Sequence, residues 1–153
     1  MGATVLAAWV GAVTGAGGIL WDVYKWKASA RPKLRVSVTP GMKVHPRQRG
    51  DPTYVSVQVS NVGTSPTTIQ NFGFSRYGSW SNRIRRRREG PCSVVLIPLT
   101  SQPLPYKIDV GTNWTGMALQ NQDLEELMQT GNLWCEVFHS FSGRSALAKI
   151  PTQ

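Results

Sequence analysis

An uncharged stretch at the N-terminus limits the folds open to this chain more than any other part of the sequence. No ionisable side chain occurs from Gly2 to Trp21, and a helix of about twenty residues reaches about 30 Å, roughly the thickness of the hydrocarbon core of a bilayer. The stretch is rich in glycine, which costs a water-exposed helix about 1 kcal/mol per residue relative to alanine but is commoner in lipid. The sequence therefore predicts a transmembrane helix over residues 2–21.

The charges around this stretch predict its topology. Ala28-Ser29-Ala30 resembles the cleavage site of a secretory signal peptide, but a signal peptide carries its positive charges before the apolar run. Here the positive charges follow it, and an aromatic cluster lies at its end: Lys25, Lys27, Arg31, Lys33 and Arg35, with Trp21, Tyr24 and Trp26. This order favours an uncleaved, single-pass anchor over residues 1–27, with a soluble domain over residues 28–153 on the cytoplasmic side.

Small residues in the predicted span bear on oligomerisation. Gly11 and Gly15 form a G-x-x-x-G pattern, which lets two helices approach closely in lipid. A stretch so rich in Gly and Ala produces this pattern easily by chance. Two alternatives therefore stay open: two copies associate through Gly11 and Gly15, or the helix does not self-associate.

Beyond residue 31 the dominant pattern is the alternation of apolar and polar residues. Valines at positions 55, 57 and 59 alternate with polar residues, and Leu34, Val36 and Val38 do the same. This period of two is typical of strands with one buried face. Short segments of this kind recur between turn-forming residues, at 34–39, 54–60, 67–74, 93–97, 106–110, 114–119, 133–139 and 145–150. They predict a mainly β domain, an antiparallel β-sandwich.

One short helix is expected within the sandwich. Asn121 is a suitable N-cap, acidic residues follow in the first turn, and Gly131 is a suitable terminator. Leu124, Leu127 and Met128 then share one face. For the core, the alternation predicts that six side chains are buried together: Val36, Val57, Val59, Phe72, Trp134 and Val137.

A resemblance to known proteins rests on the segment Val55–Ile69, with the sequence VSVQVSNVGTSPTTI. It resembles the strand, Asn-x-Gly turn and strand of immunoglobulin-like domains in bacterial adhesion and cell-surface proteins. The order of glycine-rich anchor, basic strand and this motif is also similar to small bacterial and phage-borne membrane proteins of unassigned function. The resemblance implies an immunoglobulin-like sandwich and no catalytic residues. We expect the protein in a bacterial inner membrane with its C-terminal domain cytoplasmic. The resemblance conflicts in part with this topology, because many such modules are extracytoplasmic.

Basic charge is the main functional signal. The chain has 17 Lys and Arg against 8 Asp and Glu, a balance that favours anionic partners. Arginine occupies five of the six positions 83–88, with Trp80 just before. We expect this run on an exposed loop between strands, and three interpretations compete: a solvated loop, a membrane-surface patch, and a site for nucleic acid or an anionic nucleotide. The candidate residues are Trp80, Arg83, Arg85, Arg86, Arg87 and Arg88.

Two further expectations separate these interpretations. A membrane-surface patch requires the run to lie at the same end of the domain as Arg31 and Lys33, because the lipid field decays within a Debye length of about 8 Å. If the run serves the membrane, replacing residues 85–88 by serine weakens binding of the isolated domain to anionic vesicles and leaves its thermal midpoint nearly unchanged.

The residue types needed for catalysis or metal binding are not arranged in a recognisable pattern. His45 and His139 are the only histidines and lie 94 positions apart, and neither Cys92 nor Cys135 is in a C-x-x-C pair. Nucleotide-binding glycine motifs and a G-x-S-x-G elbow do not occur. We therefore expect no enzyme activity, metal or cofactor.

Two functions from different classes remain. The first is a non-enzymatic, membrane-anchored scaffolding module whose basic surface faces the inner leaflet and which recruits a protein partner. The second is a ligand-responsive membrane effector, in which the basic domain binds an anionic nucleotide or nucleic acid and the anchor helices associate.

Overall fold

The chain divides into two compact units, residues 1–31 and 32–153. The structure is a computed structural model, and it describes residues 17–26, 31–43, 52–90, 92–95 and 100–152. Each unit is described by itself.

The described part of the N-terminal unit is a helix over residues 17–26, and every residue in it is exposed. The rings of Trp21 and Tyr24 stack with their centroids 5.8 Å apart, and Lys25 Nζ lies 5.6 Å from the Trp21 ring centroid. No helix within the described residues is long and apolar enough to cross a bilayer. Most of the predicted span, including Gly11 and Gly15, lies outside the described residues.

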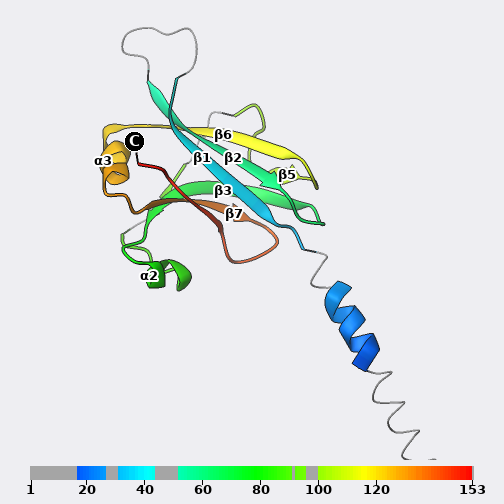
Figure 1. The fold of residues 1–153 in the computed structure, drawn as a ribbon. Helices are drawn as coiled ribbons and strands as arrows, with labels where there is room; N and C mark the ends of the chain where they lie inside the picture. The colour runs from blue at the N-terminus through cyan, green and yellow to red at the C-terminus, as the bar shows by residue number, and fades with distance from the viewer. Residues whose placement is uncertain (1–16, 27–30, 44–51, 91, 96–99, 153) are drawn as a thin grey trace, which may run out of the picture. The chain divides into compact units, whose positions relative to one another are not determined.

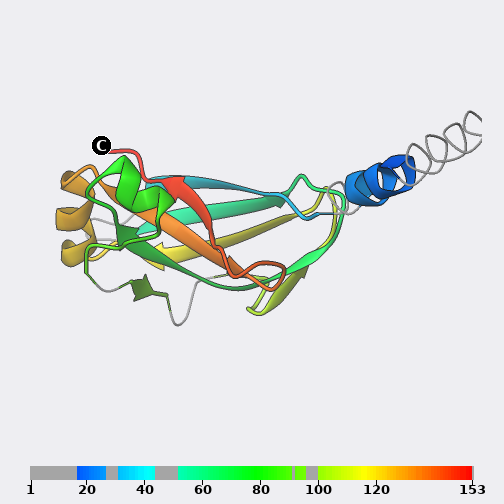
Figure 2. The same cartoon turned by 90° about the horizontal axis from the view of Figure 1, so that it is seen from below.

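The second unit consists of two antiparallel sheets that lie one over the other (Figures 1 and 2). One sheet has the order β1-β2-β6, made of β1 (Leu34–Lys43), β2 (Thr53–Asn61) and β6 (Asn113–Leu119). The other has the order β4-β3-β7-β8, with β5 also paired to β3; its strands are β3 (Thr67–Arg76), β4 (Ser93–Val94), β5 (Tyr106–Ile108), β7 (Leu133–His139) and β8 (Ala146–Lys149). The prediction of a mainly β, antiparallel sandwich is confirmed.

The core lies between the two sheets. Val55, Val57 and Val59 of β2 have no exposed surface, as their alternation predicts. They face the second sheet across the core. There the ring of Phe72, on β3 of the second sheet, meets the ring of Trp114, on β6 of the first sheet, edge to face with centroids 5.6 Å apart. Such aromatic pairs across a core add stability beyond their buried area.

The predicted core set is confirmed for four residues and differs for two. Val57, Val59, Phe72 and Val137 are fully buried. Val36 is half-buried at the margin of the core. The prediction that Trp134 is buried in the core is wrong, because its side chain lies on the other face of the strand. On β7 the inward residues are Leu133, Cys135 and Val137, so Trp134 points to the outer face of the sheet.

The Asn-x-Gly turn after β2 is organised by Asn61, which is completely buried. Its Nδ2 donates to the Ser65 carbonyl at 2.8 Å and to the Ile108 carbonyl at 3.4 Å, and its Oδ1 accepts from Gly63 N at 3.1 Å. One side chain therefore closes the turn and ties it to β5. This is the physical reason for asparagine in the motif.

The predicted short helix is confirmed as α3 (Gln122–Gln129). Asn121 caps it by accepting a hydrogen bond from Leu124 N at 3.0 Å. Leu124 and Met128 are buried, and Gly131 follows with a φ of 73°, the left-handed conformation that glycine adopts without strain. The sequence did not predict a second helix, α2 (Trp80–Ile84), between β3 and β4.

Candidate functional site at the basic end of the sandwich

The arginine run forms α2 and the turn that follows it, between β3 and β4. Ser79 caps α2 by accepting a hydrogen bond from Asn82 N at 3.2 Å. Trp80 is 70% exposed and Ile84 is 57% exposed. The run is on the surface between strands, but its five guanidinium groups have different surroundings.

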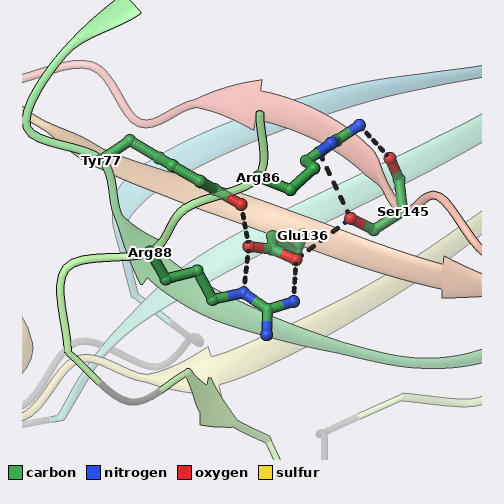
Figure 3. A network of polar contacts seen from close by, with 5 residues as sticks. All are labelled: Tyr77, Arg86, Arg88, Glu136 and Ser145. Carbon is green, nitrogen blue, oxygen red and sulfur yellow. Dashed lines mark hydrogen bonds and ion pairs between the residues drawn. The ribbon is translucent and has the colours of Figure 1, made fainter. Parts of the chain in front are cut away.

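Arg88 is fixed by a buried carboxylate. Glu136 lies on the outer face of β7 and has no exposed surface. Arg88 donates from Nε to Glu136 Oε1 at 3.0 Å and from Nη2 to Oε2 at 2.8 Å, a bidentate pair (Figure 3). Tyr77 Oη donates to Oε1 at 2.6 Å, and Ser145 Oγ donates to Oε2 at 3.0 Å. Four hydrogen bonds therefore compensate the burial of this carboxylate.

These contacts change the acidity of the residues that make them. Burial raises the pKa of Glu136, but hydrogen bonds, above all from Arg88 and then from Tyr77, outweigh burial and lower this pKa to about 2. Burial raises the pKa of Tyr77, and its hydrogen bond to Glu136 adds to this. The hydrogen bond to Glu136 raises the pKa of Arg88. The carboxylate and the guanidinium are therefore both charged at neutral pH.

Arg86 is held by the loop before β8. It donates from Nη2 to the Ser145 carbonyl at 2.8 Å and from Nη1 to Ser145 Oγ at 3.3 Å (Figure 3). Its backbone has a φ of 56°, a left-handed conformation that costs a non-glycine residue about 1 kcal/mol or more. The contacts to Ser145 offset this strain.

Arg83 stacks on an aromatic ring. Its guanidinium carbon lies 4.6 Å from the centroid of the Trp134 ring, within the range of a cation–π contact. This contact covers the outward-facing Trp134. Arg83, Arg86 and Arg88 thus have intramolecular partners and attach the loop to the outer face of the β7–β8 pair.

Arg85 and Arg87 differ from the other three. Both are exposed, and in the part of the chain that the structure describes their guanidinium groups form no hydrogen bond and no ion pair. Lys149, at the end of β8, is also exposed. The network around Glu136 leaves these cations available to a partner.

A cavity of about 210 Å³ lies beside α2. Aromatic, amide, hydroxyl and basic side chains line it: Tyr77, Gly78, Ser79, Trp80, Arg83, Asn132, Trp134 and Lys149. This site, which we call the α2 cavity, contains two of the six predicted site residues, Trp80 and Arg83. Arg85, Arg86, Arg87 and Arg88 do not line it.

The run is at the end of the domain opposite to the point where the chain enters it (Figures 1 and 2). Lys33 pairs with Val62 at the β2–β3 turn, while α2 follows the other end of β3. The ten residues of β3 separate these ends by about 30 Å at roughly 3.3 Å per residue. The membrane-surface interpretation required the run to lie near Lys33, and its position does not meet that condition.

Side chains of the types that act in catalysis in other proteins do not cluster in the described segments. No group of three or more His, Cys, Asp or Glu there could hold a metal ion. Cys135 is buried, and burial raises the pKa of its thiol, so it is a poor nucleophile. His45 lies outside the described residues.

The sequence pattern did not identify Glu136, Tyr77 or Ser145. A signal for Glu136 was present, because it is the only acid in the apolar strand Leu133–His139. A buried acid requires a cationic or hydrogen-bonding partner, and Arg88 is that partner. Comparisons with protein families, with curated proteins and with solved structures found no match to this chain.

Proposed function

We propose that this chain is a non-enzymatic interaction module that binds an anionic partner through the α2 end of its sandwich. The observation that carries the proposal is the division of the arginine run. Arg86 and Arg88 are bound to Ser145 and Glu136, whereas Arg85 and Arg87 are exposed without a partner in the described residues. The internal contacts hold the free cations in a defined place.

The charges at this end support the proposal. Neighbouring guanidinium groups repel one another, and an anion between them removes this repulsion. The buried charge of Glu136 is already neutralised by Arg88. An incoming anion therefore gains the attraction of Arg85 and Arg87 without competing with an internal carboxylate.

A second part of the proposal concerns attachment. The exposed aromatic and aliphatic residues of the helix at 17–26, among them Leu20, Trp21 and Trp26, suit an apolar environment. We propose that residues 1–27 anchor the protein in a bacterial inner membrane with an immunoglobulin-like domain on the cytoplasmic side. In this arrangement Lys33 and Arg35 are the basic residues near the inner leaflet, and the α2 end is free for a partner.

The anion-binding surface is tested with the full chain in nonionic detergent, using fluorescently labelled inorganic polyphosphate as the probe. Replacing both Arg85 and Arg87 by serine should weaken binding about tenfold at low salt, and should lower the slope of log affinity against log salt by about one to two. The matched control replaces Lys33 and Arg35 by serine, which removes the same charge at the other end. Equal losses in the two variants would contradict a defined surface at α2.

The anchor is tested by cell fractionation with an alkaline wash. The wild-type chain should stay in the membrane fraction, and Val13→Arg should reduce this fraction, because a charge in the middle of a span costs about 2.5–3.5 kcal/mol. A mature N-terminus after Ala30, found by mass spectrometry, would instead establish a cleaved signal peptide.

A ligand-responsive membrane effector is the second candidate function. The α2 cavity favours it, because a scaffold does not require a cavity lined by two tryptophans and an exposed lysine. In this version an anionic nucleotide or nucleic acid binds at α2, and Gly11 and Gly15 mediate association of the anchors. Ligand-dependent crosslinking of two full-length chains in vesicles distinguishes it from the scaffold.

A further inference from the structure

We infer that the α2 cavity is a binding site for a nucleoside phosphate, either as a free nucleotide or as a unit of a single-stranded nucleic acid. In this site a base stacks against Trp80, and the phosphate is bound by Arg85 and Arg87. The inference rests on the proposed function and specifies its ligand.

The aromatic residues of the cavity are placed for stacking. Trp80 lines the cavity and is 70% exposed. An exposed indole gains free energy when a planar group covers it. Trp134 already carries the Arg83 guanidinium on its ring at 4.6 Å. A flat group that enters the cavity therefore meets Trp80 together with a preformed Arg83–Trp134 stack. Aromatic and guanidinium planes of this kind bind unstacked bases.

The size of the cavity limits what can enter. Its volume of about 210 Å³ is below the range of roughly 300–1,000 Å³ for pockets that enclose drug-sized ligands. It is suitable for one ring system, not for a complete dinucleotide. The remainder of a nucleotide must lie outside the cavity. Lys149 lines the cavity and is exposed, and the exposed Arg85 and Arg87 come one and three residues after the end of α2.

Polar groups are available for the edge of a base. The side-chain amide of Asn132 lines the cavity and makes no hydrogen bond within the described residues. An amide offers both donors and an acceptor. Any base edge can pair with such a group, so the site needs no strict sequence preference.

A lipid surface is the main competing ligand. Trp80 and Ile84 are four residues apart on α2, so they share one face and could both insert into a bilayer. Two observations favour the nucleoside phosphate. The tryptophans line a concave site instead of a protruding apolar surface. The site also lies beyond the end of β3 that is opposite to the turn where Lys33 pairs with Val62.

The experiment compares three probes on the full chain in nonionic detergent: a labelled single-stranded oligonucleotide, inorganic polyphosphate of similar charge, and a labelled nucleoside triphosphate. The oligonucleotide or the triphosphate should bind about tenfold more tightly than polyphosphate, since base stacking adds to the charge term. Trp80→Ala should remove this preference and leave polyphosphate binding unchanged. Replacing Arg85 and Arg87 by serine should weaken binding of all three, whereas replacing Lys33 and Arg35 should not.

The outcomes separate the two levels of the proposal. If polyphosphate binds as tightly as both nucleotide probes and Trp80→Ala changes nothing, the nucleoside site is overturned and the anion-binding surface stands. If no probe binds, both are overturned. If Trp80→Ala weakens binding of a soluble short-chain anionic phospholipid, tested as a fourth probe in the same detergent, and not of nucleotides, the ligand is lipid. Tight binding of the triphosphate alone, or of the oligonucleotide alone, identifies the form of the nucleoside phosphate.

Discussion

Arg88 and Glu136 join a surface loop to the middle of a central strand. The guanidinium donates to both carboxylate oxygens, at 3.0 and 2.8 Å. The side chain of Glu136 is fully buried, whereas that of Arg88 is 39% exposed. Because the two partners differ so much in exposure, losing one is not equivalent to losing the other.

Removing Arg88 should destabilise the fold more than neutralising Glu136. Arg88→Ser leaves a buried carboxylate with only Tyr77 and Ser145, and we expect a loss of about 2–3 kcal/mol, below the usual range for a broken buried pair because solvent already screens Arg88. Glu136→Gln leaves a cation that can turn to water, with an expected loss of about 1–2 kcal/mol. Chemical denaturation of the full chain measures both.

Two controls make this comparison specific. Arg87→Ser removes a neighbouring exposed arginine and should change the unfolding free energy by no more than about 0.5 kcal/mol. The double variant Arg88→Ser with Glu136→Gln should lose less than the sum of the single losses, because the buried charge is absent. Additive losses would contradict the pairing.

The same contacts revise the expectation for the serine variant of residues 85–88. Arg86 and Arg88 have partners in the fold, so we now expect a lower thermal midpoint for that variant. Restricting the substitution to Arg85 and Arg87 should leave the midpoint nearly unchanged. Differential scanning calorimetry of the two variants tests this directly.

Acid should weaken the wild-type protein more than Glu136→Gln. The folded pKa of Glu136, about 2, lies below its ordinary value of 4.5. Its stabilising contribution is therefore complete above about pH 4.5 and is lost as the pH falls toward about 2. The difference in thermal midpoint between the two proteins should shrink between about pH 5 and pH 3. Burial also lowers the pKa of His139, and because Glu136→Gln leaves His139 in place, its effect should cancel in the comparison. An unchanged difference would argue against an ionised Glu136.

Asn61→Ala should lower the free energy of unfolding by about 2–3 kcal/mol, because it leaves the Ser65 carbonyl and the Gly63 N–H without their partner inside the turn. Asn61→Asp should cost at least as much, since a carboxylate cannot donate to the Ser65 and Ile108 carbonyls. Asn113→Ala, at an exposed position of β6, is the control. Equal unfolding free energies for the alanine variants at 61 and 113 would remove the role assigned to Asn61.

Gly73→Ala should displace β4. A Cβ at this position would lie 2.7 Å from the Ser93 carbonyl oxygen and 3.1 Å from Val94 Cα, both backbone atoms of β4. We expect the free energy of unfolding to fall by about 1–3 kcal/mol, which is typical of overpacking. Gly143→Ala is the control, because no atom lies within 4 Å of its added Cβ. Hydrogen exchange should show faster exchange at Val95 N, which donates to the Phe72 carbonyl beside β4, in the first variant only.

The sequence alone predicted the features that depend on neighbours along the chain. The alternation at Val55, Val57 and Val59 predicted the buried face of β2, and Asn121 with Gly131 predicted the ends of α3. Both signals are local, because side chains alternate along a strand and caps bind backbone groups within one turn.

Only the tertiary structure decided the role of each arginine. In the sequence the five arginines at 83–88 are equivalent, and Trp134 belongs to the same alternation as the core residues. In the fold Arg88 meets Glu136, 48 positions later, and Arg86 meets Ser145, 59 positions later. A charge is neutralised or left free by what lies within about 4 Å of it in space. Strand pairing sets that proximity, which is why Arg85 and Arg87 could be distinguished from their neighbours only after the sheets were known.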